Sequence, residues 1–227
     1  MIGDSLGDRM KAFEHCYRFT IPSKSHVIIR VDGRAFHSIG GLAKPFDAAL
    51  ITAMDLAAFR TSEEMQGFRI GYHQSDEVSF YLTNKTDNPT SEAWFGNNLS
   101  KLVSISASIF TREFNRNFDR PQVFDSRAFV LPEEEVPNYF LWRIRDWNRN
   151  SLSMFARSFF SARDLHGKSA PDVHDMLHSI GENWATLPAP CKNGSWIRRD
   201  GIVYVEQEDI GYESLRSICA AQQEATA

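Results

Sequence analysis

The chain has 227 residues, of which 42% are hydrophobic and 24% charged, so it can bury a sizeable core and is not expected to be disordered. It has no run of about eighteen apolar residues, and its first residues are charged where a signal peptide is apolar. We therefore expect no membrane span and a cytoplasmic location. The cysteines Cys16, Cys191 and Cys219 are few and scattered, which argues against a disulfide framework. The net charge of −4 excludes nucleic-acid binding through bulk charge, so such a partner would need a local basic patch.

The elements predicted up to residue 131 define a fold class. A short helix is expected over residues 4–15, with Asp4 or Ser5 as its N-cap. After it, strands are predicted for residues 26–32, 68–73, 77–82 and 123–131, and helices for residues 45–60 and 98–118. The order strand, helix, strand, strand, helix, strand is typical of a ferredoxin-like α+β sheet with its helices on one face.

The remainder of the chain has a different pattern. Residues 139–161 are rich in aromatic side chains and have helical spacing, and a second helix is expected over residues 172–180. Residues 201–206 predict a last short strand. The sequence therefore predicts a mainly helical C-terminal extension of the sheet.

Two acidic residues are expected to meet at one edge of this sheet. Asp32 ends the first strand, and Asp76 lies in the tight turn before the third strand. The first and third strands of such a fold are antiparallel neighbours, so the end of one lies beside the start of the other. Carboxylate oxygens suit Mg²⁺, and Gly33 can offer a backbone carbonyl because it has no side chain to obstruct the approach. Each motif alone would be an ordinary turn; their convergence predicts a metal site.

Strand alternation leaves open which acidic residue of the turn faces this site. Glu77 shares the polar face of the third strand with Ser79 and Tyr81, whereas Asp76 falls in register with apolar residues. Alternation alone favours Glu77 as the ligand, unless the turn interrupts the pattern at Asp76. Both residues remain candidates at this point.

Several motifs resemble those of the tRNA-His guanylyltransferase family. The most specific are Arg30-Val-Asp32-Gly33-Arg34-Ala35-Phe36-His37, Lys44-Pro45 and Tyr72-His-Gln74-Ser75-Asp76-Glu77. The resemblance extends over nearly the whole chain and is most similar to the "-like" branch, whose members repair tRNA 5′ ends. Its further motifs are Gly7-Asp-Arg-Met-Lys11, Phe124-Asp-Ser-Arg127, Tyr139-Phe-Leu-Trp142-Arg143, Leu165-His-Gly-Lys168-Ser169 and Asn183-Trp184.

This resemblance implies a polymerase-palm-like catalytic domain over residues 1–135, with residues 136–227 packed on it as a helical region, two units that can also count as one domain. It implies two Mg²⁺ ions held by Asp32, Asp76 and the carbonyl of Gly33, with Glu77 as a further catalytic candidate. It also implies that ATP or GTP activates the 5′-phosphate of tRNA, after which an incoming nucleotide adds in the 3′–5′ direction. The implied nucleotide contacts are Asp32, Gly33, Arg34, Ala35, Phe36, His37, Lys44, Ser75, Asp76 and Arg30. Alternation independently places Arg30 on the same strand face as Asp32.

The sequence departs from the family's eukaryotic pattern after Trp142-Arg143. A His-Ile-Asn-Asn type motif is replaced by Asp146-Trp-Asn148-Arg149-Asn150, so Asn148 stands where histidine is expected. This difference favours the template-dependent repair branch over a dedicated tRNA-His enzyme.

Basic residues outnumber acidic ones between residues 143 and 199. If the segment is helical, Arg145, Arg149, Ser153 and Arg157 repeat every four residues and form a basic and polar stripe suited to phosphate contacts, although an ordinary solvated face is an equal alternative. The candidate tRNA contacts are Arg145, Arg149, Asn150, Arg157, Lys168, Lys192 and Arg198. Related enzymes form dimers or tetramers, and the aromatic segment 139–160 would suit such an interface.

Two other functions are compatible with the pattern. A palm-type nucleotide cyclase would share the fold, but its Gly-Gly-Asp-Glu-Phe hairpin is here Gln-Ser-Asp-Glu. A catalytically silent protein that binds tRNA or nucleotides is the other alternative, and retention of both Asp32 and Asp76 argues against it.

Overall fold

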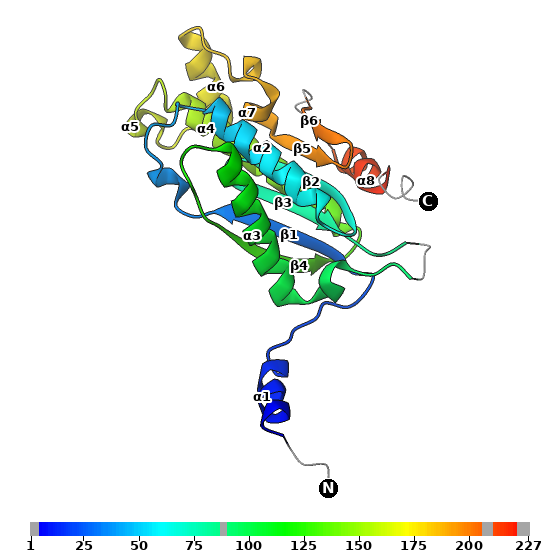
Figure 1. Ribbon diagram of the computed structural model, residues 1–227. Helices are drawn as coiled ribbons and strands as arrows, with labels where there is room; N and C mark the ends of the chain where they lie inside the picture. Colours follow the sequence, from blue (N-terminus) through cyan, green and yellow to red (C-terminus); the bar gives the residue numbers. More distant parts are fainter. Residues whose placement is uncertain (1–4, 87–89, 206–210, 222–227) are drawn as a thin grey trace.

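The centre of the molecule is an antiparallel sheet of six strands in the order β4-β1-β3-β2-β5-β6 (Figure 1). The computed structural model describes residues 5–86, 90–205 and 211–221. The strands are β1 His26–Gly33, β2 Phe68–Gln74, β3 Glu77–Leu82, β4 Phe124–Leu131, β5 Ser195–Arg198 and β6 Gly201–Val203. The four strands predicted before residue 132 are confirmed to within one residue at each end, and so is the α+β class.

The sheet has two strands more than the first part of the chain predicts. β5 pairs with β2 and β6 pairs with β5, so the C-terminal region extends the same sheet and is not only helical. The sequence indicated a strand over residues 201–206, of which residue 206 lies outside the described part. It missed β5, because a strand of four residues leaves too short a pattern to detect.

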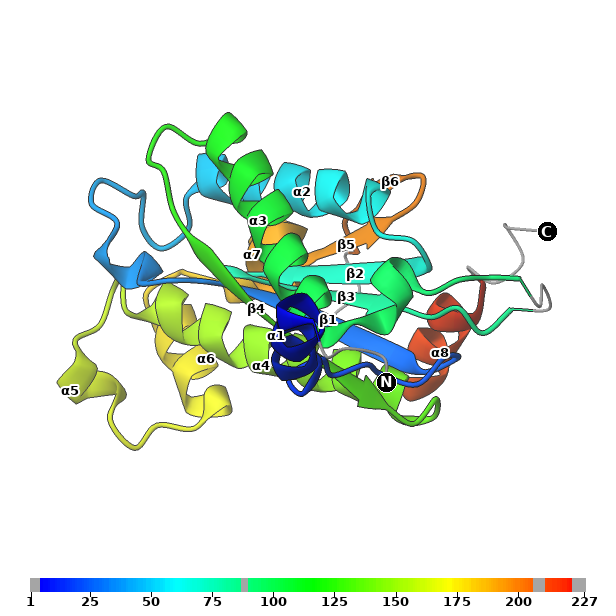
Figure 2. The ribbon, with the colours of Figure 1, turned by 60° about the horizontal axis from the view of Figure 1, so that its bottom comes forward.

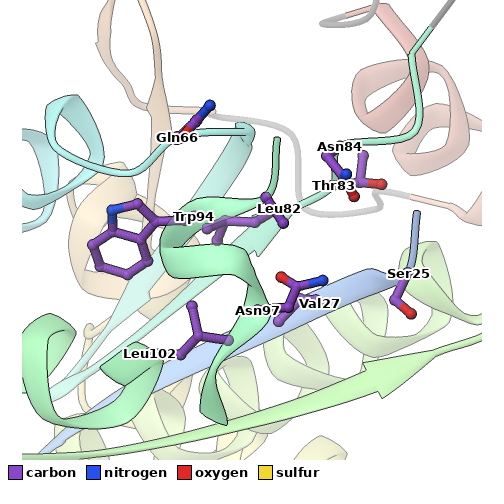
Figure 3. Close-up of a pocket in the computed structure, with 10 residues that line it drawn as sticks. Ser25, Val27, Gln66, Leu82, Thr83, Asn84, Trp94, Asn97 and Leu102 are labelled. Carbon is purple, nitrogen blue, oxygen red and sulfur yellow. The ribbon is translucent and has the colours of Figure 1, made fainter. Parts of the chain in front are cut away.

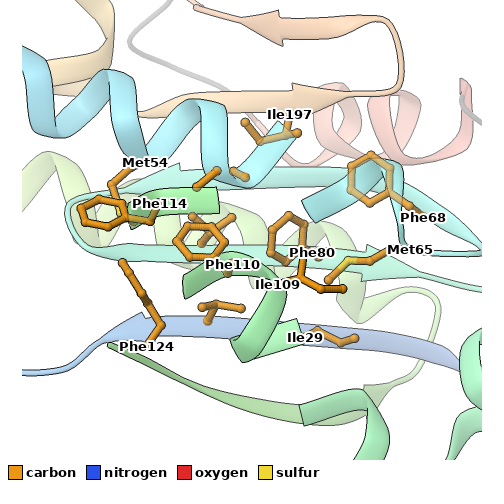
Figure 4. Packing of buried hydrophobic residues seen from close by; sticks show 14 of the residues in the cluster. Ile29, Met54, Met65, Phe68, Phe80, Ile109, Phe110, Phe114, Phe124 and Ile197 are labelled. Carbon is orange, nitrogen blue, oxygen red and sulfur yellow. The ribbon is translucent and has the colours of Figure 1, made fainter. Parts of the chain in front are cut away.

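Two helices, α2 Ala48–Glu63 and α3 Leu99–Asn117, cover one face of the sheet (Figures 1 and 2). α2 begins later than predicted because Asp47 is its N-cap and accepts a hydrogen bond from the Leu50 amide. Figure 4 shows the core beneath the two helices, in which Phe80, Phe110 and Phe114 are completely buried. Such aromatic burial dominates the stability of a domain of this size.

The opposite face is covered by α4 Glu135–Ala156 and α8 Tyr212–Ala221 (Figure 2). α4 starts before the predicted Tyr139 and ends before Ser161. Its aromatic residues Tyr139, Phe140, Trp147 and Phe155 are buried within the protomer. The expectation that this segment forms a subunit interface is therefore wrong for these side chains, since the chain's own core uses them.

Short helices surround the end of α4. They are α5 Ala162–Leu165, α6 Ala170–Ser179, η3 Trp184–Thr186 and α7 Ala189–Asn193, while η1 Phe36–Ser38 and η2 Trp94–Asn97 lie in earlier loops. Leu152 and Phe155 of α4 pack with Val173 and Leu177 of α6 in a separate small core. This cluster fixes α6 against the second half of α4.

The first helix, α1 Leu6–His15, projects away from the sheet (Figure 1). Ser5 caps it by accepting a hydrogen bond from the Asp8 amide, which confirms the predicted helix and one of its two predicted caps. None of its residues is buried, and Leu6 and Phe13 are 65% and 67% exposed. Within the described residues, no helix combines the length and apolar character needed to cross a bilayer.

Candidate active site

Three carboxylates form a row across one end of the sheet. Asp32, at the end of β1, pairs in register with Glu77 at the start of β3 and with Asp125 at the start of β4. Directly opposed residues of antiparallel strands point to the same face, so the three side chains are neighbours. The convergence of Asp32 with the turn before β3 is confirmed.

Asp76 joins this row from the turn between β2 and β3. Its carbonyl oxygen accepts a hydrogen bond of 2.9 Å from the Gly33 amide, which ties the turn to the end of β1. Ser75 has a left-handed φ of 54°, and β3 begins only at Glu77. The alternation of β3 therefore does not extend to Asp76, which removes the conflict over its direction.

The surroundings of Asp76 disfavour its negative charge. Burial raises the pKa of Asp76 above the ordinary value, and the nearby Asp32 carboxylate raises it further. In the described part of the chain, no three His, Cys, Asp or Glu side chains form a ready metal cluster. The two aspartates and a backbone carbonyl nevertheless form a hard-oxygen donor set, and a divalent cation would relieve the repulsion between the carboxylates.

Glu77 has a different environment, although it is the neighbour of Asp76. Its carboxylate forms ion pairs with Arg143 of α4, at 2.8 Å, and with Arg30 of β1, at 3.5 Å. Burial raises the pKa of Glu77 even though both guanidinium groups act in the opposite direction. Two cations already neutralise this carboxylate, so it is better placed to fasten α4 to the sheet than to hold a metal.

The loop after β1 shows why position 33 is glycine. A Cβ atom there would lie 2.3 Å from the ring of Phe36, which is buried against Phe114 and Phe124. Phe36 therefore belongs to the core, and only its backbone can meet a nucleotide. Arg34 and Ala35 are exposed in the same loop, and Ala35 has a left-handed φ of 59°. His37 follows in η1, and Lys44 is exposed in the loop before α2.

One basic side chain of the site was missed by the sequence interpretation. Arg127 of β4 lies 3.4 Å from Asp32 and equally far from Asp125, with half of its side chain exposed. The Asp-Ser-Arg motif at residues 125–127 was noted but given no role. The alternation that places Arg127 on the same face as Asp125 in the predicted strand 123–131 was the available signal.

The predicted tRNA contacts divide into two groups. Arg145, Arg149, Asn150 and Arg157 are exposed on or just after α4, so the helical stripe exists. Arg149 and Lys168 line a pocket of about 250 Å³ between α4 and α6, whose walls include Leu152 and Val173. Arg143 of α4 is paired with Glu77 at the end of the sheet that carries Asp32. The residues of α4 that follow Arg143 therefore extend beyond this end of the sheet.

Lys192 and Arg198 do not belong to this surface. Lys192 is 5% exposed, and its ammonium group donates to the Ala185 carbonyl oxygen at 2.6 Å. Arg198 is paired with Asp200 and lies at the opposite end of the sheet, because β5 runs antiparallel to β2. The proposed tRNA role is wrong for Lys192 on grounds of burial, and Arg198 is separated from the other candidates.

Asn148 has a partner within the chain. Its amide nitrogen donates to the Lys192 carbonyl oxygen at 2.6 Å, which connects α4 to α7. A side chain committed to this contact holds two elements of the protein together.

A small pocket lies at the other end of the sheet, between Val27, Leu82 and Trp94 (Figure 3). Its volume is about 10 Å³, which is space for about one water molecule. It is too small for a nucleotide, and the acidic row remains the candidate active site.

A comparison with protein families agrees with this site. The model of a family described as "tRNAHis guanylyltransferase" matches residues 7–132, more than half of the chain. The chain belongs to this family. It is therefore a nucleotidyltransferase, and the matched range contains Asp32, Asp76 and Glu77.

Solved structures and curated relatives support the same family. A bacterial tRNA(His) guanylyltransferase-like protein in complex with ATP has a TM-score of 0.88 and 37% identity, covering 95% of this chain and 100% of that one. A GTP complex of a bacterial protein described in the same words has a TM-score of 0.80 and 36% identity, covering 96% of this chain and 100% of that one. The tRNA(His) guanylyltransferase of Schizosaccharomyces pombe is 30% identical, over 77% of this chain and 74% of its own.

Proposed function

We propose that this nucleotidyltransferase repairs the 5′ ends of tRNAs by adding nucleotides in the 3′–5′ direction. The observation that carries the proposal is that Asp32, at the end of β1, lies beside the turn that carries Asp76, which is bonded to the Gly33 amide, in a chain of the tRNA(His) guanylyltransferase family. We assign catalysis to residues 1–135, and tRNA positioning to residues 136–227.

The proposed reaction consists of two successive displacements at phosphorus, each with its own leaving group. In the first, an oxygen of the tRNA 5′-phosphate attacks the α-phosphorus of ATP or GTP and pyrophosphate leaves. In the second, the 3′-hydroxyl of an incoming nucleoside triphosphate attacks the activated 5′-phosphorus and the nucleoside monophosphate leaves. Each step adds negative charge to phosphoryl oxygens, and positioning and charge stabilisation provide most of the catalysis in such reactions.

Asp32, Asp76 and the Gly33 carbonyl would hold the two Mg²⁺ ions of the proposed reaction. Mg²⁺ bound there would stabilise charge on the attacking and leaving oxygens. Arg30 and Arg127 add positive charge beside the acidic row, at Glu77 and Asp32 respectively. Glu77 supports the site by fixing Arg143, and therefore α4, against the sheet.

The loop after β1 is the proposed nucleotide-binding segment, with Arg34, the backbone of residues 35–37, Ser75 and Lys44 as contacts. Solved complexes of bacterial guanylyltransferase-like proteins contain ATP and GTP, which supports both nucleotides as substrates here. The exposed side chains of Arg34 and Lys44 can neutralise triphosphate charge.

The exposed cations of α4 and Lys168 are the proposed tRNA contacts. They project beyond the end of the sheet that carries Asp32, where a 5′ end must enter. Asn148 supports repair of several tRNAs over a tRNA-His-specific reaction, because its amide is committed to the Lys192 carbonyl rather than presented to a substrate.

We also propose that the chain forms a homo-oligomer, a dimer or tetramer, through α1. The apolar residues Leu6, Met10 and Phe13 repeat along one side of this helix and are at least 47% exposed. Tyr17 and Phe19, directly after the helix, are also exposed. A second copy of the chain would bury this surface, which no part of the described protomer covers.

The test is a substrate comparison. Purified protein with Mg²⁺, ATP and GTP would be incubated with 5′-monophosphorylated tRNAs that lack their first nucleotide, and with full-length tRNA-His. The proposal predicts extension of truncated tRNAs of several identities by the nucleotide that pairs with the 3′ strand. Addition of G to tRNA-His alone would refute the repair function while preserving the family activity.

A further inference from the structure

A buried ion pair lies next to the turn that carries Asp76. His73 of β2 and Asp55 of α2 are 2% and 1% exposed, and the histidine Nδ1 lies 2.7 Å from a carboxylate oxygen of Asp55. Such a pair is costly to bury unless its geometry is good and its remaining hydrogen-bonding atoms are satisfied.

The second ring nitrogen of His73 contacts the turn itself. Its Nε2 lies 3.0 Å from the carbonyl oxygen of Ser75, the residue before Asp76. A carbonyl and a carboxylate can only accept, so making both bonds requires hydrogen on both ring nitrogens. Burial lowers the pKa of His73, but the Asp55 charge and these hydrogen bonds outweigh it and raise the pKa above its ordinary value.

Asp55 is in turn held by the C-terminal strands. Its other carboxylate oxygen accepts hydrogen bonds of 3.1 Å from the hydroxyl groups of Ser195 in β5 and Tyr204 just after β6. Gly194 lets β5 approach closely, since a Cβ there would lie 2.5 Å from the His73 carbonyl oxygen. Asp55 therefore has partners on two sides and is a rigid support for His73.

The turn needs such support. Ser75 occupies the left-handed region, where a residue other than glycine stays only if surrounding contacts hold it. Two donors hold the carbonyl oxygens of the turn: the Gly33 amide is bonded to that of Asp76, and His73 Nε2 to that of Ser75.

We propose that His73, supported by Asp55, is a positioning residue that holds the Ser75 carbonyl and so keeps the Asp76 carboxylate beside Asp32. The role rests on the proposed function, since it matters only if Asp76 takes part in the reaction. This role would also connect the C-terminal strands to the turn that carries Asp76. Ser195 and Tyr204, which lie outside the family match of residues 7–132, both donate hydrogen bonds to Asp55.

Two substitutions of His73 separate its two hydrogen bonds. The amide nitrogen of asparagine can replace Nδ1 and reach Asp55, but it is too short for Ser75. The amide nitrogen of glutamine can replace Nε2 and reach the Ser75 carbonyl. His73→Asn and His73→Gln therefore form a matched pair of neutral variants that differ in which of the two contacts survives.

The first measurement uses metal-free protein and no substrate. Hydrogen exchange of the Gly33 amide, which is bonded to the Asp76 carbonyl, reports how firmly the turn is held. We expect exchange to be at least about fivefold faster in His73→Asn than in His73→Gln. Equal exchange in the two variants would overturn the proposal, whether or not the protein is an active enzyme.

The second measurement is the rate of 5′ addition. A displacement of about 1 Å can lower a catalytic rate about a hundredfold, so kcat of His73→Asn should be at least about tenfold below that of His73→Gln, with similar KM for tRNA. A merely structural histidine would instead give kcat values that follow the Tm of each variant, and that result would contradict the role. Failure of the wild type to extend tRNA would reject the proposed function and leave the exchange result to decide on the turn.

A second pair of variants, at Asp55, tests the same role with His73 unchanged, in case the His73 variants do not fold. In Asp55→Asn the amide can donate to Nδ1 of a neutral His73, leaving Nε2–H on Ser75 and an oxygen for Ser195 and Tyr204. Asp55→Leu has a similar volume and none of these contacts. We expect at least about tenfold higher kcat and slower Gly33 exchange in Asp55→Asn than in Asp55→Leu; equal values would contradict the proposal.

Discussion

Asp32 and Glu77 are direct partners between β1 and β3, yet their carboxylates have opposite surroundings. The Asp32 side chain is 31% exposed and has Arg127 at 3.4 Å, whereas the Glu77 side chain is 11% exposed and lies between two arginines. One carboxylate is accessible at the end of the sheet, and the other is already neutralised. This difference is the basis of our proposal that Asp32 takes part in the chemistry and that Glu77 supports the structure.

Glu77→Ala should therefore affect stability more than chemistry. The substitution removes the carboxylate that pairs with the buried guanidinium of Arg143 and leaves Asp146, at 3.4 Å, as its remaining ion-pair partner; breaking a buried pair costs about 3–5 kcal/mol. We expect a loss of about 2–4 kcal/mol in the free energy of unfolding, because Asp146 still supplies part of the counter-charge. Urea denaturation measures it, and kcat measured well below the new Tm should fall less than in Asp32→Asn. A fully folded but inactive Glu77→Ala protein would contradict this assignment.

Asp76→Asn should stabilise the metal-free protein at pH 7. The pKa of Asp76 is raised in the folded state, so the folded chain holds this proton more tightly than the unfolded chain. The protonated Asp76 carboxyl therefore stabilises the folded chain below the unfolded pKa of about 3.9, and this stabilisation is lost as pH rises through the folded pKa. At pH 7 with a chelator, we expect a Tm higher than that of the wild type by about 2–4 °C.

The same difference should shrink toward pH 4, where the wild-type carboxyl becomes protonated. Addition of Mg²⁺ should raise the Tm of the wild type and leave that of Asp76→Asn nearly constant, because ligands stabilise the state that binds them. Calorimetry at the two pH values measures both effects. An Asp76→Asn variant with a lower Tm than the wild type at both pH values would contradict the conclusion that the folded protein disfavours the charge of Asp76.

Arg149→Ala and Lys168→Ala should each weaken tRNA binding severalfold. Each removes one exposed cation from the pocket between α4 and α6, so the slope of log K against log salt should fall by about one. Filter binding over a salt series measures the slope. Arg198→Ala is the matched control, because this residue lies at the opposite end of the sheet. Equal losses in all three variants would show that charge alone, rather than this surface, determines binding.

Leu6→Asp combined with Phe13→Asp should reduce the oligomer to smaller species. Both side chains are about two-thirds exposed on α1, and a carboxylate at either position would resist burial against a second copy. Light scattering after gel filtration measures the mass, with Leu56→Asp on α2 as a control at another exposed apolar position. An unchanged mass, or a monomeric wild type, would contradict an interface through α1.

The sequence predicted the central fold well because its strands have clear boundaries. β1 ends at Gly33, and polar residues 74–76 mark the β2–β3 turn, which consists of Ser75 and Asp76. Chain order alone was then enough to bring Asp32 to the turn that carries Asp76. The convergence of the two residues is a property of antiparallel pairing, so it did not depend on side-chain detail.

Other features depend on contacts that no local pattern contains. Alternation favoured Glu77 over Asp76, but it fails where Ser75 leaves the extended region. Lys192 appeared to be a surface cation, as lysines usually are, until its contact with the Ala185 carbonyl placed it inside. The pair of His73 and Asp55 joins β2 to α2, and only the packed structure reveals it.

The most direct test of the account is the rate of a single 5′ addition by wild-type protein, Asp32→Asn and Asp200→Asn. Asp200 is an exposed aspartate at the opposite end of the sheet, so its substitution controls for the loss of one negative charge. Rapid quenching with truncated, 5′-monophosphorylated tRNA, labelled nucleotide and Mg²⁺ isolates the chemical step. We predict equal rates for wild type and Asp200→Asn and a rate about a thousandfold lower for Asp32→Asn, which corresponds to about 4 kcal/mol of barrier. Equal rates for all three proteins, or no addition by the wild type, would contradict the account.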